Sequence, residues 1–344
     1  MRKQRKSVVL FGELLMRLET PGHKRFVQAE QFDIGYTGGE ANAGVTLVNF
    51  GAAADLVAAV PDNDIGQACI NHMRRFGLDT ERVQRRGPRL GTFYLETGAA
   101  QRSTKVVYDR AGSSFSLLKP GDVPWKEVLE GKNWLHFTGT APALGADLVA
   151  LTEEGCVEAK KQGLTVSCDL NYRSALWSIE QAREVMQRLV GYVDVLIVNE
   201  EHAREILEVE IDASTRECDR FDGRRYEGQA RALIEHYELS HVAITARAGS
   251  FADDTSVSAF IDDGRVHHMA RRYGMRVVDR IGGGDAFTGA LIYALLEEWD
   301  VERSVEFAVA AGCLKHSVPA DLGHMSRDEV FALMHDPNAG RVDR

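Results

Sequence analysis

The sequence predicts an α/β protein with a mainly parallel central sheet that is covered by helices on both faces. The first observation is a series of short apolar runs, each entered from a helical segment or from the loop after one. Such alternation is typical of parallel sheets, because a helix carries the chain back between neighbouring strands. The second observation is a pair of segments with a different pattern, in which the alternation of apolar and polar residues predicts half-exposed antiparallel strands.

The large sheet is expected to contain five apolar runs, which are Val8–Glu13, Leu135–Thr138, Thr165–Asp169, Val195–Val198 and Val242–Thr245. Helices are expected at Asn42–Phe50 and Ile65–Phe76. The second of these follows Asp62-Asn63-Asp64, whose side chains are good helix caps.

This different pattern appears in Phe26–Ile34 and again in Gly91–Tyr108. Apolar and polar residues alternate in Thr92–Glu96 and Lys105–Tyr108. This pattern is typical of antiparallel strands with one exposed face.

Composition and charge exclude several classes of protein. The chain has 344 residues, 44% of them hydrophobic, which is enough for one large core. Its net charge of −10 argues against a nucleic-acid binder, which needs a basic face. No run approaches the roughly 18 apolar residues that cross a membrane, and no signal-type apolar region follows the basic Met1–Lys6. Five scattered cysteines without CxxC spacing suggest reduced thiols in the cytoplasm.

We expect a single domain over residues 1–344, because the sequence contains no internal repeat and no low-complexity linker. The most polar segment is Asp212–Tyr226. Its many charges favour a solvated surface insertion over a partner site.

The most informative segment is a glycine turn between a predicted strand and a predicted helix. Gly282, Gly283 and Gly284 precede Asp285, and the helix runs on to Leu296. Glycines allow the backbone to approach a ligand closely, and the helix start supplies N–H groups and a positive dipole end for an anion. A carboxylate there is suited to take a proton from a hydroxyl while the amides hold a phosphoryl group. For this segment alone, an ordinary capped turn remains the alternative.

A second motif lies near the N-terminus. Gly38 and Gly39 again permit close backbone approach, here to a polyhydroxylated ligand. Asn42, four residues after Gly38, can both donate and accept hydrogen bonds, as sugar hydroxyls require.

The two motifs together resemble the paired signatures of PfkB-type (ribokinase-like) carbohydrate kinases, and the resemblance runs from about Ser7 to about Leu333. It implies a three-layer α/β/α core and a β-sheet lid over the sugar, formed by segments of about residues 14–36 and 91–110. It also implies ATP and Mg²⁺ as cofactors and a homo-oligomer, a dimer or larger.

One segment indicates which molecule receives the phosphoryl group, namely Asp169-Leu170-Asn171-Tyr172-Arg173-Ser174-Ala175-Leu176-Trp177. This segment follows a strand, where open α/β sheets bind ligands, and Arg173 offers a fork suited to a carboxylate. Pairing of Arg173 with Asp169 or Glu201 is the structural alternative. The segment resembles the D-x-N-x-R-x-x-L-W pattern of 2-keto-3-deoxygluconate kinases within the family. Two other segments resemble other parts of the same subgroup: Asp279–Asp285 resembles its form of the glycine motif, and Ala311–Leu322 is similar to its helix and loop near the nucleotide. That resemblance implies that Tyr108, Arg110 and Arg173 recognise the acid, while Asp285 activates the C6 hydroxyl.

The residues that bind ATP and magnesium are predicted from the ends of two expected strands. Asn199-Glu200-Glu201-His202 resembles the family's N-x-x-E motif, which acts on magnesium through water, but His202 stands in place of its Glu. The resemblance leaves Glu200 or Glu201 as the carboxylate and His202 as a solvent-facing residue. The ATP-binding residues that it implies are Asn199, Thr245, Arg247, Gly249, Gly282 and Gly284.

Three other functions remain as alternatives. One is a kinase of the same family that acts on a neutral sugar such as fructose or ribose, or on a nucleoside. Another is a nicotinamide dehydrogenase, although G-x-G-x-x-G does not follow the first strand. The third is a sugar-binding protein that has lost catalysis, against which the intact Asp285 and its glycines argue.

Overall fold

The computed structural model describes residues 6–249 and 251–336, which are built around one large sheet. Its strand order is β13-β12-β11-β10-β9-β8-β1-β4-β5, and β14 also pairs with β12. The strands are β1 (Ser7–Phe11), β4 (Ala53–Val60), β5 (Val83–Arg85), β8 (Trp134–Thr138), β9 (Thr165–Asp169), β10 (Val195–Asn199), β11 (His241–Ala248), β12 (Asp254–Asp262), β13 (His267–Met269) and β14 (Tyr273–Arg276). Strands β11 to β5 pair in parallel, while β12 pairs antiparallel with β11, β13 and β14. The expected mainly parallel sheet is confirmed.

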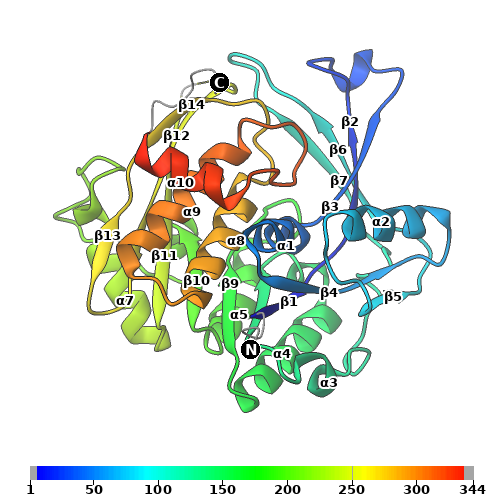
Figure 1. Cartoon of the computed structure of the whole chain (residues 1–344), viewed down its shortest axis with the longest axis horizontal. Helices are drawn as coiled ribbons and strands as arrows, with labels where there is room; N and C mark the ends of the chain where they lie inside the picture. The colour runs from blue at the N-terminus through cyan, green and yellow to red at the C-terminus, as the bar shows by residue number, and fades with distance from the viewer. Residues whose placement is uncertain (1–5, 250, 337–344) are drawn as a thin grey trace.

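Helices cover both faces of this sheet (Figure 1). One layer contains α1 (Gly39–Phe50), α8 (Gly283–Leu296), α9 (Val301–Lys315) and α10 (Arg327–His335). The other contains α3 (Trp125–Leu129), α4 (Ala146–Lys161), α5 (Ile179–Val190), α6 (Glu200–Ile206) and α7 (Glu227–Tyr237). From β1 to β4 the chain moves along the sheet in one direction, and from β8 to β11 in the other. Right-handed crossovers therefore place the two sets of helices on opposite faces.

Helix α8 is buried on almost every side because it packs between α1 and α9. The sequence explains this, since Ala286–Leu296 is apolar around the whole helix instead of along one stripe. A helix start held in this way cannot shift without disturbing the core, so the residues at its N-terminus have fixed positions.

Most predicted bounds agree with the structure. Strand β9 has the predicted limits, and α2 (Asp64–Arg75) begins where expected, with the Asn63 side chain accepting from the Gly66 amide. One expectation is wrong. Within Phe26–Ile34, residues Phe26–Gln28 form a 3-10 turn, and the strand begins only at Asp33.

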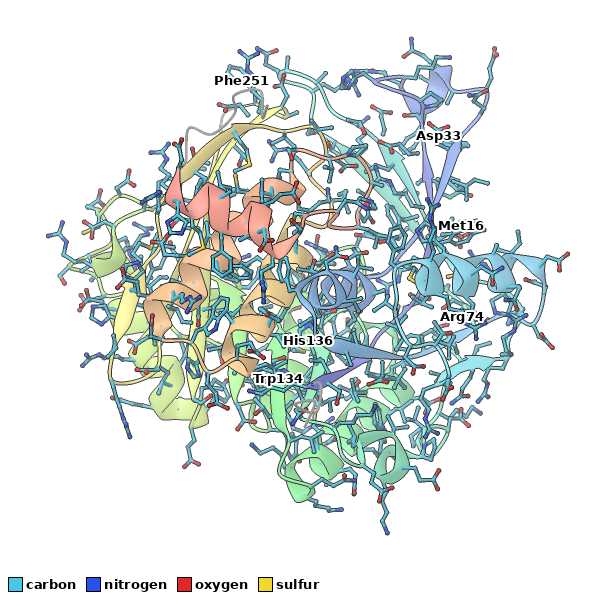
Figure 2. The ribbon with its side chains drawn as sticks, viewed as in Figure 1. Met16, Asp33, Arg74, Trp134, His136 and Phe251 are labelled. Atoms are coloured by element: carbon cyan, nitrogen blue, oxygen red, sulfur yellow. The ribbon has the colours of Figure 1, made fainter. Side chains whose placement is uncertain are left out.

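A second sheet of four strands projects from the large one at the upper right of Figure 1, in the order β3-β2-β6-β7. Its strands are β2 (Leu15–Glu19), β3 (Asp33–Thr37), β6 (Gly91–Glu96) and β7 (Lys105–Asp109). Met16 and Asp33 lie on it, whereas Trp134 and His136 lie at the centre of the molecule on β8 (Figure 2). We call this sheet the lid. It is not wholly antiparallel as expected, because β2 and β6 pair in parallel.

Two short 3-10 turns, Pro142–Leu144 and Gly223–Arg225, complete the regular structure of the described residues. Within residues 6–249 and 251–336, no helix is both long enough and apolar enough to span a membrane.

Candidate active site

A cleft of about 1230 Å³ lies between the lid and the carboxyl ends of β9, β10 and β11. It is the place where an open α/β sheet is expected to bind a ligand. Every site residue predicted above lines it, namely Gly38, Gly39, Asn42, Tyr108, Arg110, Arg173, Asn199, Glu200, Glu201, Thr245, Arg247, Gly249, Gly282, Gly283, Gly284 and Asp285. The fold therefore brings both glycine motifs and both arginines to one cavity.

The glycine turn needs glycine for packing as well as for conformation. Gly282 is left-handed, with φ of 83°, and a Cβ there would lie 1.9 Å from the Asp321 carbonyl oxygen. A Cβ on Gly283 would lie 2.1 Å from the His316 ring. Gly284 is exposed and has open space around its Cβ position. The first two glycines therefore let the turn pack against the chain after α9, while the third leaves the cleft side open.

Asp285 lies in the first turn of α8 and is held from α1. The Asn42 side-chain amide donates to its Oδ2 at 2.7 Å. Burial raises the pKa of the Asp285 carboxyl to about 7, the Asn42 hydrogen bond opposes the rise, and the charges of Asp169 and Asp321 add to it. A carboxylate with a pKa near neutrality is well suited to accept a proton at physiological pH.

The first glycine motif frames the same carboxylate. A Cβ on Gly38 would lie 2.4 Å from the Glu13 carbonyl oxygen, so no side chain fits there. A Cβ on Gly39 would lie 3.7 Å from Asp285 Oδ1, within the space in front of the carboxylate. The Gly38-Gly39 pair thus lets α1 start close to Asp285 and leaves room for a ligand between the two helix starts.

The two arginines differ in their surroundings. Arg173 is exposed, and among the described residues no acid forms an ion pair with it. The proposed pairing with Asp169 or Glu201 is therefore absent. Arg110 is buried, and its Nε donates to Glu13 Oε2 at 2.5 Å. Glu13 orients Arg110 and offsets its charge, so Arg173 is the stronger candidate for an incoming anion.

Tyr108 lies on β7 beside this pair and points toward the cleft, since it packs on the inner lid cluster of Leu15, Phe93 and Leu95. Ile281 packs on the same cluster. The lid therefore contacts the chain just before the glycine turn.

At the nucleotide end of the cleft, Asn199 caps α6. Its Oδ1 accepts from the His202 amide at 2.7 Å. The His202 ring packs edge-on against Tyr172, with a centroid separation of 5.6 Å, and burial lowers the pKa of this histidine to about 4. The expectation that His202 faces solvent is wrong, because it is a half-buried, neutral residue in the cleft wall.

Glu200 and Glu201 are not equivalent. Arg225 holds the Glu200 carboxylate through two hydrogen bonds of 2.7 and 2.8 Å. Glu201 is exposed at the cleft. The ion pair between Arg225 and Glu200 also attaches the polar segment Asp212–Tyr226 to α6, so this insertion is not merely a solvated loop.

Thr245, Arg247 and Gly249 lie in sequence along the end of β11. Arg247 Nη2 lies 3.5 Å from the His316 ring, beside the glycine turn. A Cβ on Gly249 would lie 2.4 Å from the Asp254 carbonyl oxygen, so glycine is required by the close approach of β12.

Sequence reasoning missed Arg17, which is buried on the inner face of β2. It donates to Asp279 Oδ2 at 2.6 Å and also to Asp321. The Thr37 hydroxyl lies 2.6 Å from Asp321 and 2.9 Å from Asn42. A chain of polar contacts therefore runs from the lid to the residue that holds Asp285. An arginine between Met16 and Leu18 in a short strand was the available signal.

The structure also accounts for Arg280. Its guanidinium donates to the carbonyl oxygens of Phe251, Ala252 and Asp254, at 2.7, 2.5 and 3.2 Å respectively. This residue thus fixes the turn that enters β12 at the edge of the cleft.

Comparison with known proteins assigns the chain to a family. Residues 5–321 match the model of the pfkB family carbohydrate kinases. The protein belongs to this family. The structure of a 2-dehydro-3-deoxygluconokinase from Thermotoga maritima is 40% identical, covers 97% of this chain and 100% of its own, and superposes with a TM-score of 0.92.

Two further proteins are similar to this chain, one in sequence and one in fold. A 2-dehydro-3-deoxygalactonokinase from Haloferax volcanii is 30% identical over 98% of this chain and 99% of its own. A ribokinase II from E. coli, solved in complex with ATP and Mg²⁺, is 17% identical and shares the fold with a TM-score of 0.79 over 96% of this chain and 99% of its own.

Proposed function

We propose that this carbohydrate kinase transfers the γ-phosphoryl group of ATP to the C6 hydroxyl of a 2-keto-3-deoxy sugar acid, with 2-keto-3-deoxygluconate as the favoured acceptor. The observation that carries the proposal is the guanidinium of Arg173, which lies in the same cleft as Asp285 and forms no ion pair with any residue that the structure describes. A free cation in a sugar site favours an acidic acceptor, because a neutral sugar offers it no charge.

The acid end of the acceptor is assigned to Arg173, with Arg110 and Tyr108 on the lid side. The Nε of Arg110 donates to Glu13, and in this assignment the two outer nitrogens of Arg110, which lines the cleft, are left for the acid. The names of two similar proteins, a gluconokinase and a galactonokinase of the 2-dehydro-3-deoxy acids, support a ketoacid without choosing its epimer. The epimers differ by one hydroxyl, which changes only one or two contacts.

Asp285 is assigned as the general base. Burial keeps its pKa near neutrality, so the carboxylate can accept the hydroxyl proton as the oxygen attacks phosphorus. Asn42 holds the carboxylate through one oxygen and leaves the other, Oδ1, on the side of Gly39 and the cleft. The proton acceptor is therefore oriented by a residue of a different helix.

The amides of Gly282, Gly283 and Gly284 are assigned to the transferred phosphoryl group. Phosphoryl transfer asks for little covalent work from the protein, and most of the catalysis is positioning and charge stabilisation. The α8 start provides N–H donors and a positive dipole end in a turn that is packed too tightly to rearrange.

ATP would be held by Asn199, Thr245, Arg247 and Gly249 along the ends of β10 and β11. The residues also fit Mg²⁺, which usually takes one or two carboxylates together with phosphates and keeps several waters. Glu201 is exposed and suited to act through water, whereas Glu200 is held by Arg225. When bound, the ion neutralises charge on the phosphates.

Wild-type protein tests this proposal in an assay of ADP release with ATP and Mg²⁺. The acceptors are 2-keto-3-deoxygluconate, 2-keto-3-deoxygalactonate, fructose, ribose and adenosine. We expect the highest kcat/KM on one of the two ketoacids. Highest turnover on a neutral acceptor would refute the substrate assignment and leave the Asp285 chemistry standing.

A neutral-sugar kinase is the second candidate, and one observation favours it. Glu13 pairs with Arg110, so within the described residues Arg173 is the only one of the two predicted arginines without an ion pair. This candidate predicts that Arg173→Ala leaves turnover of the neutral sugar unchanged.

We further propose that the protein is a homo-oligomer that associates through the outer face of the lid. Ile34, Leu18, Tyr94 and Val107 are direct neighbours on adjacent strands and form one apolar row on that face. Ile34 and Val107 are 64% and 52% exposed. A second copy of the lid would cover this row. The five free thiols are in keeping with a cytoplasmic location.

A further inference from the structure

A fully buried lysine, Lys315, ends helix α9 directly behind the glycine turn. A buried ammonium is costly unless it has partners, so its environment calls for a reason. Its Nζ lies 3.5 Å from the Asp279 carbonyl oxygen and 3.4 Å from the Val318 carbonyl oxygen. Both partners are therefore main-chain oxygens.

The nearby carboxylates have other partners. Asp279 accepts from Arg17 and from the Ile281 amide, at 2.6 and 2.9 Å. Asp321 accepts from Arg17 and lies 2.6 Å from the Thr37 hydroxyl. Lys315 is thus not the ion-pair partner of either acid.

Burial lowers the pKa of the Lys315 ammonium, and the negative charges of Asp279 and Asp321 oppose that shift. Arg17 adds a like charge that again lowers this pKa. The two acids therefore favour a charged Lys315.

The two carbonyls that Lys315 contacts belong to the two segments next to the glycine turn, one that leads into it and one that packs against it. Asp279 precedes Gly282, and Val318 lies in the loop that packs on it. The amides of Val278 and Asp279 donate to the His316 carbonyl, at 2.8 and 3.3 Å. A cation between the carbonyls completes this attachment.

We propose that Lys315 is a positioning residue that acts as a tethered monovalent cation beneath the glycine turn. Its ammonium holds the carbonyls of Asp279 and Val318 together, and thereby keeps the amides of Gly282–Gly284 directed into the cleft. This inference rests on the proposed role of those amides in phosphoryl transfer.

The test uses Lys315→Met, which keeps most of the apolar stem of the side chain and removes the ammonium group at its end. Initial rates are measured in chloride salts of equal ionic strength, with K⁺, NH₄⁺ or tetramethylammonium as the only monovalent cation. We expect Lys315→Met to lose roughly 10–100-fold in kcat in tetramethylammonium, the effect of a charge-assisted hydrogen bond. K⁺ and NH₄⁺ should restore most of the loss, because they fit the vacated space.

Wild-type rates should be nearly the same in all three salts, because its cation is covalently attached. The matched control is Lys160→Met, which removes a surface lysine paired with Asp194 and should behave as wild type. Three results would overturn the proposal: a wild type that needs K⁺ or NH₄⁺, a folded Lys315→Met with normal kcat, or a loss that small cations do not restore.

The acceptor in this assay is whichever sugar wild type phosphorylates fastest, so an incorrect ketoacid assignment does not affect the test. Thermal unfolding provides a readout that needs no turnover. The midpoint of Lys315→Met should be higher in K⁺ or NH₄⁺ than in tetramethylammonium, whereas that of wild type should not change. If Lys315→Met cannot be obtained folded, Lys315→Gln replaces it. The Gln amide is uncharged and can donate to one of the two carbonyls but does not supply a cation between them.

Discussion

The start of α8 and the lid meet in one cleft but are built in opposite ways. The Asp285 carboxylate accepts a hydrogen bond from Asn42 of a neighbouring helix, and Gly282 and Gly283 have no room for a side chain. On the lid, alternate residues face the cleft and the surroundings, and Ile34 and Val107 are largely exposed. In the roles proposed above, phosphoryl transfer belongs to the packed start of α8, whereas association with a second copy belongs to the exposed outer face of the lid.

The largest expected effect is at the rigid end. Asp285→Asn should lower kcat by roughly 10²–10⁴-fold, because the general base is lost while the shape is kept. Asp64→Asn is the matched control, since Asp64 also lies in the first turn of a helix but is exposed at α2. A variant that keeps most of its turnover would remove Asp285 from the mechanism.

The same substitution should not destabilise the fold near pH 8. A carboxyl whose pKa is raised by folding stabilises the native state when protonated, and this contribution is lost as pH rises through about 7. Asn cannot carry that buried charge, so the unfolding temperature of Asp285→Asn should equal or exceed that of wild type in alkaline buffer. A clear fall in this temperature would mean that the kcat loss reports misfolding.

A smaller effect is expected on the recognition side. Arg173→Ala should raise KM for the ketoacid by about one to two decades, the equivalent of roughly 1.5–3 kcal/mol for a charge-assisted hydrogen bond. Its kcat should change less, because the chemistry lies at the other end of the acceptor. Arg188→Ala, an exposed arginine of α5, is the control. An unchanged KM would leave Arg173 without a role in binding.

The dependence of kcat/KM on pH should report the ionisation of Asp285. Since Asp285 must be deprotonated to act as a base, kcat/KM should fall about tenfold per pH unit below about pH 7. The residual activity of Asp285→Asn should lack this step. A wild-type profile that stays flat to about pH 5 would show that another group accepts the proton.

The smallest effect on turnover is expected from the outer face of the lid. Ile34→Lys places a charge in the apolar row and should shift the oligomer toward monomer with little change in kcat. Val266→Lys is its control, since Val266 is 57% exposed on the turn before β13. Light scattering after size exclusion measures the mass. An unchanged mass for Ile34→Lys would place any interface elsewhere.

Much of the framework could be predicted from the sequence because each element carried its own local signal. The apolar run Thr165–Asp169 and the caps before α2 needed no knowledge of the rest of the chain. The two glycine motifs were also local. All of the residues predicted from these motifs line the cleft, although their roles remain proposals.

The relations that sequence reasoning missed join segments far apart in the chain. Arg17 meets Asp279 and Asp321, and Lys315 meets the Asp279 carbonyl, only after the lid packs on the glycine turn. Glu13 likewise offsets the charge of Arg110 across the start of the lid. His202 was expected to face solvent, but its ring packs edge-on against Tyr172, a contact between α6 and the loop after β9 that the local sequence does not show.

In the proposed function, Arg173 selects an acidic acceptor and Asp285 accepts the proton of its hydroxyl. The most direct test compares kcat/KM for 2-keto-3-deoxygluconate with that for its carboxamide, which removes the charge and keeps the size. Wild type should prefer the acid by roughly 10–100-fold, and Arg173→Ala should lose most of that preference. Equal use of acid and amide by wild type would contradict the account.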